Sequence, residues 1–126
     1  MEVICTDIAE LFFDASDSVL HIKLIEGAKI NLKNCSEHFK LIRKITKNKK
    51  YVSLIDATDF FTIEKEALRL CAGKTKVNVI AASYYTANLA NKLTANFFIA
   101  FYKPAIPVSL FKSKSEALAW LQQKMP

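Results

Sequence analysis

Glycine and proline are scarce in this chain of 126 residues, which contains two glycines and three prolines. Linkers and disordered segments are rich in these residue types, so their scarcity argues against both. The sequence also has no internal repeat and no low-complexity tract. Because 52% of the residues are hydrophobic and the length suits one compact domain, we expect residues 1–126 to form a single folded domain.

A long hydrophobic run is also missing from the sequence. The longest apolar stretch, residues 95–101, is interrupted by Asn96 and followed by Lys103 and Pro104, so it is too short to cross a bilayer. The chain does not open with the basic segment and apolar run of a signal peptide. These absences predict a cytoplasmic protein without a transmembrane segment.

The cysteines and histidines lack the spacing of a metal site. The three cysteines are an odd number: Cys5, Cys35 and Cys71. Reduced thiols that pack as small hydrophobic residues fit this pattern, and they suit the cytoplasm. His21 and His38 are far apart, and neither belongs to a local ligand pattern. We therefore predict no bound metal and no cofactor.

Short catalytic signatures are absent as well. Gly73, Lys74 and Thr75 resemble the end of a phosphate-binding P-loop, but Leu68 stands where the motif needs its first glycine. A helix is also predicted before these residues, where the motif needs a strand. No Gly-x-Ser-x-Gly elbow occurs in the chain. The sequence favours a non-catalytic protein, with an enzyme assembled from distant residues as the alternative.

Hydrophobic periodicity and turn residues predict strands that alternate with helices. Strands are expected at 9–14, 18–26, 51–56, 77–83 and 108–111, and helices at 32–47, 63–72, 85–102 and after the capping box of 113–116. Thr62 is expected to cap the second helix. The first two strands form an antiparallel pair, and three strand–helix units follow. The predicted fold class is α/β, with a mixed, mostly parallel sheet of about five strands and four helices.

The third predicted helix, 85–102, carries two contrasting stripes. One is apolar and is expected to face the core: Leu89, Leu93, Phe97 and Phe101. The opposite stripe is polar, and the following aromatic run has more large groups than one core face needs. These features predict a partner surface for a homodimer or another protein, formed by Asn88, Lys92, Asn96, Phe98 and Tyr102. A plain solvated face, or a helix buried all round, is the alternative.

Charge is unevenly distributed, although the net charge is +6. Residues 1–20 contain five acidic side chains and no basic one, and residues 40–50 contain six basic side chains. Such a basic patch could attract an anionic partner such as a nucleic acid or an anionic membrane. The simpler interpretation, which we favour over nucleic-acid binding, is a solvated helix face that runs into a lysine-rich loop.

Polar side chains follow three of the predicted strands. Ligands of open parallel α/β sheets usually bind beyond the carboxyl ends of the strands. The candidate ligand-binding residues at these ends are Asp56, Thr58, Ser83, Tyr84 and Lys112. In the alternative interpretation, Asp56 and Thr58 form hydrogen bonds to the loop backbone and hold the following helix in place.

Several short motifs occur in a familiar order. They lie at 20–23, 27–28, 54–57, 62–67, 96–99, 103–104, 107–108, 110–111 and 116–121. In order and spacing the chain resembles the STAS/anti-sigma-factor-antagonist-like family, especially small uncharacterised STAS-like proteins of Bacteroidetes. The resemblance covers about residues 18–123. It implies a mixed sheet with helices, and a regulatory or interaction module instead of an enzyme.

The resemblance is incomplete at one functional position. In true antagonists a serine is phosphorylated in an Asp-Ser-Ser-Gly-like segment after the middle strand. The equivalent stretch here, residues 62–65, has no serine, and its only hydroxyl belongs to Thr62. The partner-switching mechanism is therefore not transferred to this chain. We expect a non-catalytic STAS-like interaction module, with a small-ligand or lipid-binding domain as the alternative.

Overall fold

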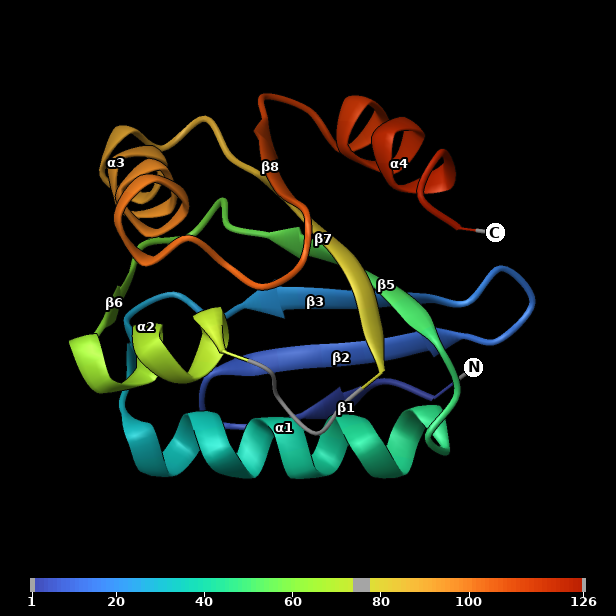
Figure 1. Cartoon of the computed structure of the whole chain (residues 1–126). Coiled ribbons are helices and arrows are strands. Elements are labelled where there is room, and N and C mark those ends of the chain that lie inside the picture. Colours follow the sequence, from blue (N-terminus) through green and yellow to red (C-terminus); the bar gives the residue numbers. More distant parts are fainter. Residues whose placement is uncertain (1, 74–77, 126) are drawn as a thin grey trace.

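A computed structural model describes residues 2–73 and 78–125 (Figure 1). Its main sheet has six strands in the order β1-β2-β3-β5-β7-β8. Their bounds are β1 Ile4–Cys5, β2 Ala9–Asp14, β3 Val19–Leu24, β5 Tyr51–Asp56, β7 Val79–Tyr85 and β8 Val108–Phe111. The first three strands pair antiparallel, and β3, β5, β7 and β8 pair parallel. The predicted α/β class is therefore confirmed.

The strand count differs slightly from the prediction of about five. The additional strand, β1, is only two residues long and pairs with β2, so it has no periodicity that a sequence could reveal. A separate two-stranded parallel sheet is formed by β4 Ala28–Ile30 and β6 Phe61–Ile63. The expected strand start at Val77 and the P-loop-like Lys74 and Thr75 lie outside the described residues.

The helices divide unequally between the two faces of the main sheet. Their bounds are α1 Leu32–Thr46, α2 Lys65–Ala72, α3 Leu89–Phe97, the π-helical turn η1 Phe98–Tyr102, and α4 Lys114–Gln122. In Figure 1, α4 lies apart from the other three helices, across β5 and β7. We call its side of the sheet the α4 face, and the side of α1, α2 and α3 the three-helix face.

Each face of the sheet has its own hydrophobic core. On the three-helix face, Leu20, Ile22 and Leu24 of β3 are buried, and they belong to the same core as Ile42 of α1. The smaller core on the α4 face contains Val19, Val52, Leu54, Ala81, Ala117 and Leu121. Because side chains alternate along a strand, one set of buried strands serves both cores.

The start of α2 differs from the prediction. Thr62 lies in β6 and is paired with Lys29 of β4, so it does not cap the helix. The N-cap is Glu64, whose side chain makes no capping hydrogen bond. Because β6 pairs in parallel with β4, the backbone stays extended through Ile63, and the helix begins only at Lys65. Sequence reasoning missed this pairing because both strands have only three residues.

The third helix also differs, both in its bounds and in the face that it buries. Residue 85 still belongs to β7, and the helix begins after Asn88, whose side chain accepts a hydrogen bond from the backbone N–H of Asn91. From Phe98 the chain continues as η1. The apolar residues expected in the core are exposed, with exposed fractions of 46–72%: Leu89, Leu93, Phe97 and Phe101. We call these four residues the apolar stripe.

The opposite side of this helix is buried. Asn91, Ala95 and Phe98 face the sheet with exposed fractions of 1%, 6% and 5%. Asn91 is held there by hydrogen bonds to the loop after β5. The prediction that the leucines of this helix face the core is therefore wrong. Asn91 and Ala95 face the sheet instead and determine how α3 is oriented.

The last helix agrees with its sequence signal. Ser113 caps α4, since its hydroxyl oxygen accepts a hydrogen bond from the N–H of Glu116 at 3.3 Å. The Ser113 hydroxyl in turn donates to the Glu116 carboxylate at 2.9 Å. Within the described ranges, 2–73 and 78–125, every helix is too short or too polar to span a bilayer.

Candidate functional site

A cavity of about 660 Å³ lies between the three-helix face of the sheet and the helices that cover it. Most of its lining is hydrophobic. Representative side chains from the sheet, α1, α2 and η1 are Ile22, Ile55, Phe39, Ile42, Leu68 and Phe98. The volume falls within the range of small-molecule sites. The cavity is therefore the principal candidate site in the described part of the chain.

Short side chains keep this space open. Ser53, Ala57, Ala82 and Ala95 line the cavity from the sheet, from the loop after β5 and from α3. Protein interiors are normally packed as densely as organic crystals, so a side chain of ordinary size at these positions would fill part of the space. Four small buried residues thus lie around the cavity.

Asn91 is the best-defined polar group in the lining. Its side-chain nitrogen donates to the carbonyl oxygens of Ala57 at 2.6 Å and Asp59 at 2.8 Å. These bonds join α3 to the loop at the carboxyl end of β5. Its side-chain oxygen Oδ1 is buried and has no hydrogen-bond partner in the described residues. One acceptor of this buried side chain therefore has no partner among the described residues.

Burial shifts the pKa values of two further polar side chains of the lining, His38 and Tyr84. Burial lowers the pKa of His38 to about 4, so the imidazole is neutral near pH 7, and its Nδ1 atom is buried without a partner among the described residues. Burial also raises the pKa of the Tyr84 phenol well above its usual value. Both groups are therefore uncharged in a largely apolar space.

Two thiols also line the cavity. The sulfur atoms of Cys35 on α1 and Cys71 on α2 are 3.6 Å apart. The hydrogen bond between them lowers the pKa of Cys35 and raises that of Cys71, and burial further raises the pKa of Cys71. Cys5, in contrast, is exposed. All three cysteines are free thiols in this structure.

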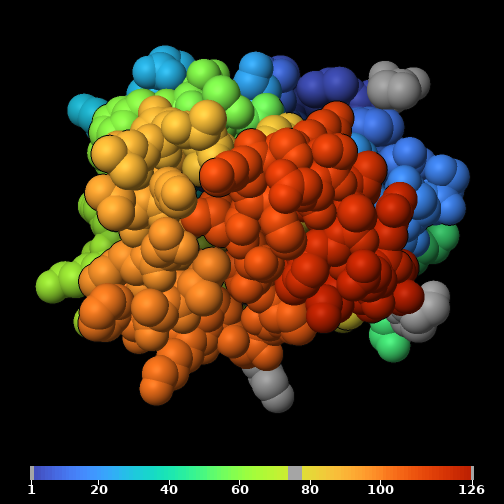
Figure 2. Space-filling view, turned by 90° about the horizontal axis from the view of Figure 1, so that it is seen from above, coloured from blue at the N-terminus to red at the C-terminus, as the bar shows by residue number. Residues whose placement is uncertain are grey.

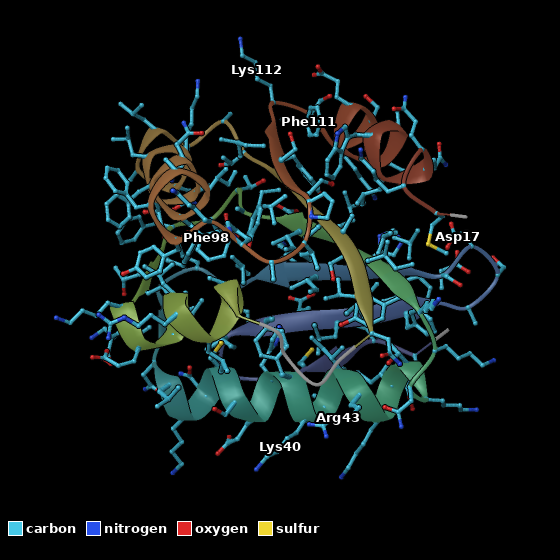
Figure 3. The ribbon with its side chains drawn as sticks, viewed as in Figure 1. Asp17, Lys40, Arg43, Phe98, Phe111 and Lys112 are labelled. Atoms are coloured by element: carbon cyan, nitrogen blue, oxygen red, sulfur yellow. The ribbon has the colours of Figure 1, made fainter. Side chains whose placement is uncertain are left out.

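The five ligand-binding residues predicted from strand ends do not converge on one site. Tyr84 lines the cavity, whereas Ser83 points to the α4 face, where its hydroxyl donates to the carbonyl of Ala117 at 3.1 Å. Lys112 is exposed and points away from the fold in Figure 3. Thr58 is exposed, and its N–H donates to the Asp56 carboxylate at 2.9 Å. The Asp56 carboxylate thus holds the loop backbone, as in the alternative interpretation, and Thr58 contributes its backbone N–H to that bond.

Asp56 lines a second, shallower pocket of about 220 Å³ on the α4 face, together with His21, Lys23, Tyr85 and Lys114. Burial and then the charge of Asp56 raise the pKa of Tyr85 to about 12. Burial, followed by the charge of Lys114, lowers the pKa of His21. Tyr84 and Tyr85 are consecutive in β7, so their side chains point to opposite faces and line different pockets.

Comparison with known proteins places the chain in a family. The family model for a domain of unknown function, DUF7793, matches residues 13–125. The chain belongs to DUF7793. A comparison with curated proteins finds no match. The DUF7793 match covers both faces of the sheet and all the helices described above.

A solved structure resembles this DUF7793 member in fold. It is an uncharacterised protein of the DUF3478 family from Shewanella loihica PV-4, with a SpoIIAA-like fold. The TM-score is 0.61 at 19% sequence identity, and the match covers 96% of this chain and 98% of that chain. The similarity shows that the fold is STAS-like, as the sequence resemblance implied.

The predicted partner surface is divided between the two sides of α3 and η1. Lys92 and Asn96 are exposed, Asn88 is the N-cap, and Phe98 is buried with Tyr102 stacked on it at a ring distance of 6.2 Å. The apolar stripe is on the exposed side of α3 and η1, and this segment is gold and orange in Figure 2. Sequence reasoning missed this exposure. The available signal was Asn91, a polar residue between Leu89 and Leu93 that is buried in their place.

The basic patch lies on the solvent side of α1 and in the loop that follows. Lys40 points away from the sheet in Figure 3, whereas Arg43 is half-buried and its Nε atom has no hydrogen-bond partner among the described residues. Lys44, Lys47, Lys49 and Lys50 are exposed. This placement suits a solvated helix face and leaves the cavity as the better-defined site.

Proposed function

We propose that this protein is a non-catalytic STAS-like module that binds an apolar small molecule or lipid in the cavity. The observation that carries the proposal is a space of about 660 Å³ lined mainly by hydrophobic side chains. A site of this kind binds by burying apolar ligand surface, and a few polar groups set the orientation of the ligand. This function is the small-ligand alternative of the sequence analysis, but the site is the cavity and not the strand-end residues predicted there.

The energetic cost of an empty cavity supports occupancy. Side chains beside an unfilled space lose the contacts that a densely packed interior would give them. Water relieves the cost poorly, because an apolar lining offers few hydrogen-bond partners. An apolar ligand would restore the missing contacts.

Native mass spectrometry of the purified protein tests the proposal, with a denatured sample as control. We expect an additional mass that is retained under native conditions and lost on denaturation. Protein stripped of this ligand should bind added decane. Ligand-free wild-type protein that also fails to bind decane would contradict the proposal.

Two substitutions on α3 locate the binding. Ala95→Phe places a ring where Ala95 lines the cavity, whereas Ala90→Phe places the same ring on the exposed side of the helix. We expect decane binding to fall at least about tenfold in the first variant, since the ring occupies space that the ligand needs. Binding should be unchanged in the second variant. Equal binding by both would place the site elsewhere.

A second candidate function, self-association, is favoured by the apolar stripe. Contiguous exposed apolar groups mark interfaces, and the tilted rings of Phe97 and Phe101 are in contact, with centroids 4.7 Å apart. A two-fold axis would place the stripe of one copy against that of another, so the occupant would be a second copy of this chain. This is the homodimer of the sequence analysis, on the other side of the helix.

Light scattering after size-exclusion chromatography tests the self-association. We expect a dimer that the double substitution Leu93→Glu and Phe101→Glu converts to a monomer, because buried unpaired carboxylates are costly. Lys92→Glu, which changes an exposed neighbour outside the stripe, is the matched control and should stay dimeric. A monomeric wild-type protein at high concentration would exclude this candidate.

A further inference from the structure

Two of the three cysteines are brought together by the fold. Cys35 lies in the first turn of α1 and Cys71 in the last turn of α2, 36 positions apart in the sequence, yet their sulfur atoms are 3.6 Å apart. Cys5 is exposed and lies in β1, at the edge of the main sheet. The tertiary structure thus creates one thiol pair and leaves the third cysteine as an internal reference.

The contact between the two sulfur atoms favours a thiolate. The thiolate, and not the thiol, is the nucleophile of cysteine chemistry. When one group loses its proton, the S–H of the other donates a hydrogen bond to the resulting anion, and this bond lowers the pKa of Cys35. Either sulfur can hold the remaining proton, so the anion also forms on Cys71, which is the less buried of the two. A nucleophile and a second thiol are therefore in contact.

The surroundings of the pair leave room for its sulfur atoms to approach. A disulfide bond is about 2.05 Å long, so the two atoms must move about 1.5 Å closer together. Both residues are among those that line the cavity of about 660 Å³. The parts of α1 and α2 that carry them therefore border open space, where a shift of this size displaces fewer neighbours than in a densely packed interior.

We propose that Cys35 and Cys71 form a redox-active dithiol, which a hydroperoxide oxidises to a disulfide that joins α1 to α2. This inference does not depend on the proposed binding function. Two thiols in contact are what the reaction needs, because the first sulfur to be oxidised requires a second thiol close by to complete the disulfide.

The reaction has two steps. The Cys71 thiolate attacks the terminal peroxide oxygen: an S–O bond forms, the O–O bond breaks, and the alkoxide that leaves takes up the proton that the pair released. The Cys35 sulfur then attacks the sulfur of this sulfenic acid: the S–S bond forms, the S–O bond breaks, and hydroxide leaves as water with the Cys35 proton. Two thiols are oxidised, and one hydroperoxide is reduced to an alcohol and water.

The disulfide should stabilise the folded protein measurably. It would link residues 36 positions apart, and a link of this kind restricts the unfolded chain more than the folded one. We expect the midpoint of thermal unfolding to rise by roughly 5–15 °C on oxidation, and to return to its original value on reduction with dithiothreitol.

Limited oxidation of the reduced, folded wild-type protein by hydrogen peroxide tests the inference. We expect a product that is lighter by two hydrogen atoms. Its proteolytic digest should contain the Cys35 and Cys71 peptides joined to each other, while Cys5 still reacts with iodoacetamide. Oxidation confined to Cys5, or joined peptides that form only after the protein has been unfolded, would overturn the inference.

Cys5→Ser is the matched control for Cys71→Ser. Cys5→Ser should form the same disulfide with the same rise in the midpoint, because both members of the pair are retained. Cys71→Ser should show no rise, and oxidation should add oxygen atoms to its remaining thiols instead. Each variant is compared in its own oxidised and reduced forms, so a lower starting stability does not affect the result. An equal rise in Cys71→Ser would assign the effect to other residues and overturn the role of the pair.

Discussion

The two faces of the sheet show opposite ways of covering the same strands. On the α4 face, one helix packs so closely that Ala117 and Leu121 are fully buried against Val52 and Ala81. On the three-helix face, more helix covers a larger area and still leaves a cavity of about 660 Å³. Alanines occur at both contacts, but only at α4 do they bring the two surfaces together. Helix content alone thus says little about packing density.

The largest expected effect is the loss of stability when a leucine of the α4 face is truncated, and a leucine at the cavity provides the comparison. Leu121 is fully buried on the α4 face, whereas Leu68 of α2 lines the cavity. We expect Leu121→Ala to lower the free energy of unfolding by about 3–4 kcal/mol, and Leu68→Ala by about 2 kcal/mol in ligand-free protein, because Leu68 already has fewer neighbours. Urea denaturation measures both values. Equal losses would mean that the cavity is closed or filled in solution.

A pH effect is expected from the three-helix face. Burial lowers the pKa of His38 to about 4 in the folded protein, against about 6.5 in the unfolded chain. The folded state prefers the neutral ring, so the free energy of unfolding has its full value above pH 6.5, where the unfolded chain is also neutral at His38. As the pH falls from 6.5 towards 4, His38 is protonated first in the unfolded chain, and the folded state loses stability. We expect a loss of roughly 3 kcal/mol over that range.

The variant His38→Gln isolates this contribution. Glutamine does not titrate, so the difference in unfolding free energy between wild type and variant should change between pH 7 and pH 4. His21 is retained in both proteins, and its own lowered pKa therefore cancels in the comparison. A constant difference across this range would show that His38 is hydrated in solution.

The comparison also explains which parts of the structure the sequence could predict. Leu20, Ile22 and Leu24 alternate in a short strand, and their burial followed from that period. The Ser113–Glu116 capping box is equally local. Thr62 was assigned wrongly because its partner Lys29 lies far away in the sequence. Local signals were reliable, and pairings between distant short segments were not.

The candidate site was harder to predict than the fold. Strand ends were recognised, but Ser83 and Tyr84 point to opposite faces, so residues adjacent in the sequence serve different surroundings. On α3, hydrophobic periodicity favoured Leu89 and Leu93 for the core, whereas Asn91 is buried instead. Two carbonyls from the loop after β5 determine this choice. No local pattern reports the position of those carbonyls.

A smaller effect is expected from enlarging one alanine on each face. Ala117 is fully buried in a dense contact, so Ala117→Leu should cost about 1–3 kcal/mol by overpacking. Ala95 borders the cavity, so Ala95→Leu should be neutral or should stabilise the ligand-free protein by about 1 kcal/mol. Thermal unfolding of both variants measures the contrast. A comparable loss in Ala95→Leu would mean that no free space adjoins α3.

The smallest effect is expected on the outer side of the same helix. Leu93 is 61% exposed, so Leu93→Ser should change the unfolding free energy of the isolated chain by no more than about 0.5 kcal/mol. If the apolar stripe is covered by a second copy, the loss should be larger and should depend on protein concentration, because dissociation then precedes unfolding. Thermal unfolding at two widely separated concentrations distinguishes these cases. A small effect at both concentrations would mean that the stripe is solvated, and the difference between the inner and outer sides of α3 would then reflect folding alone.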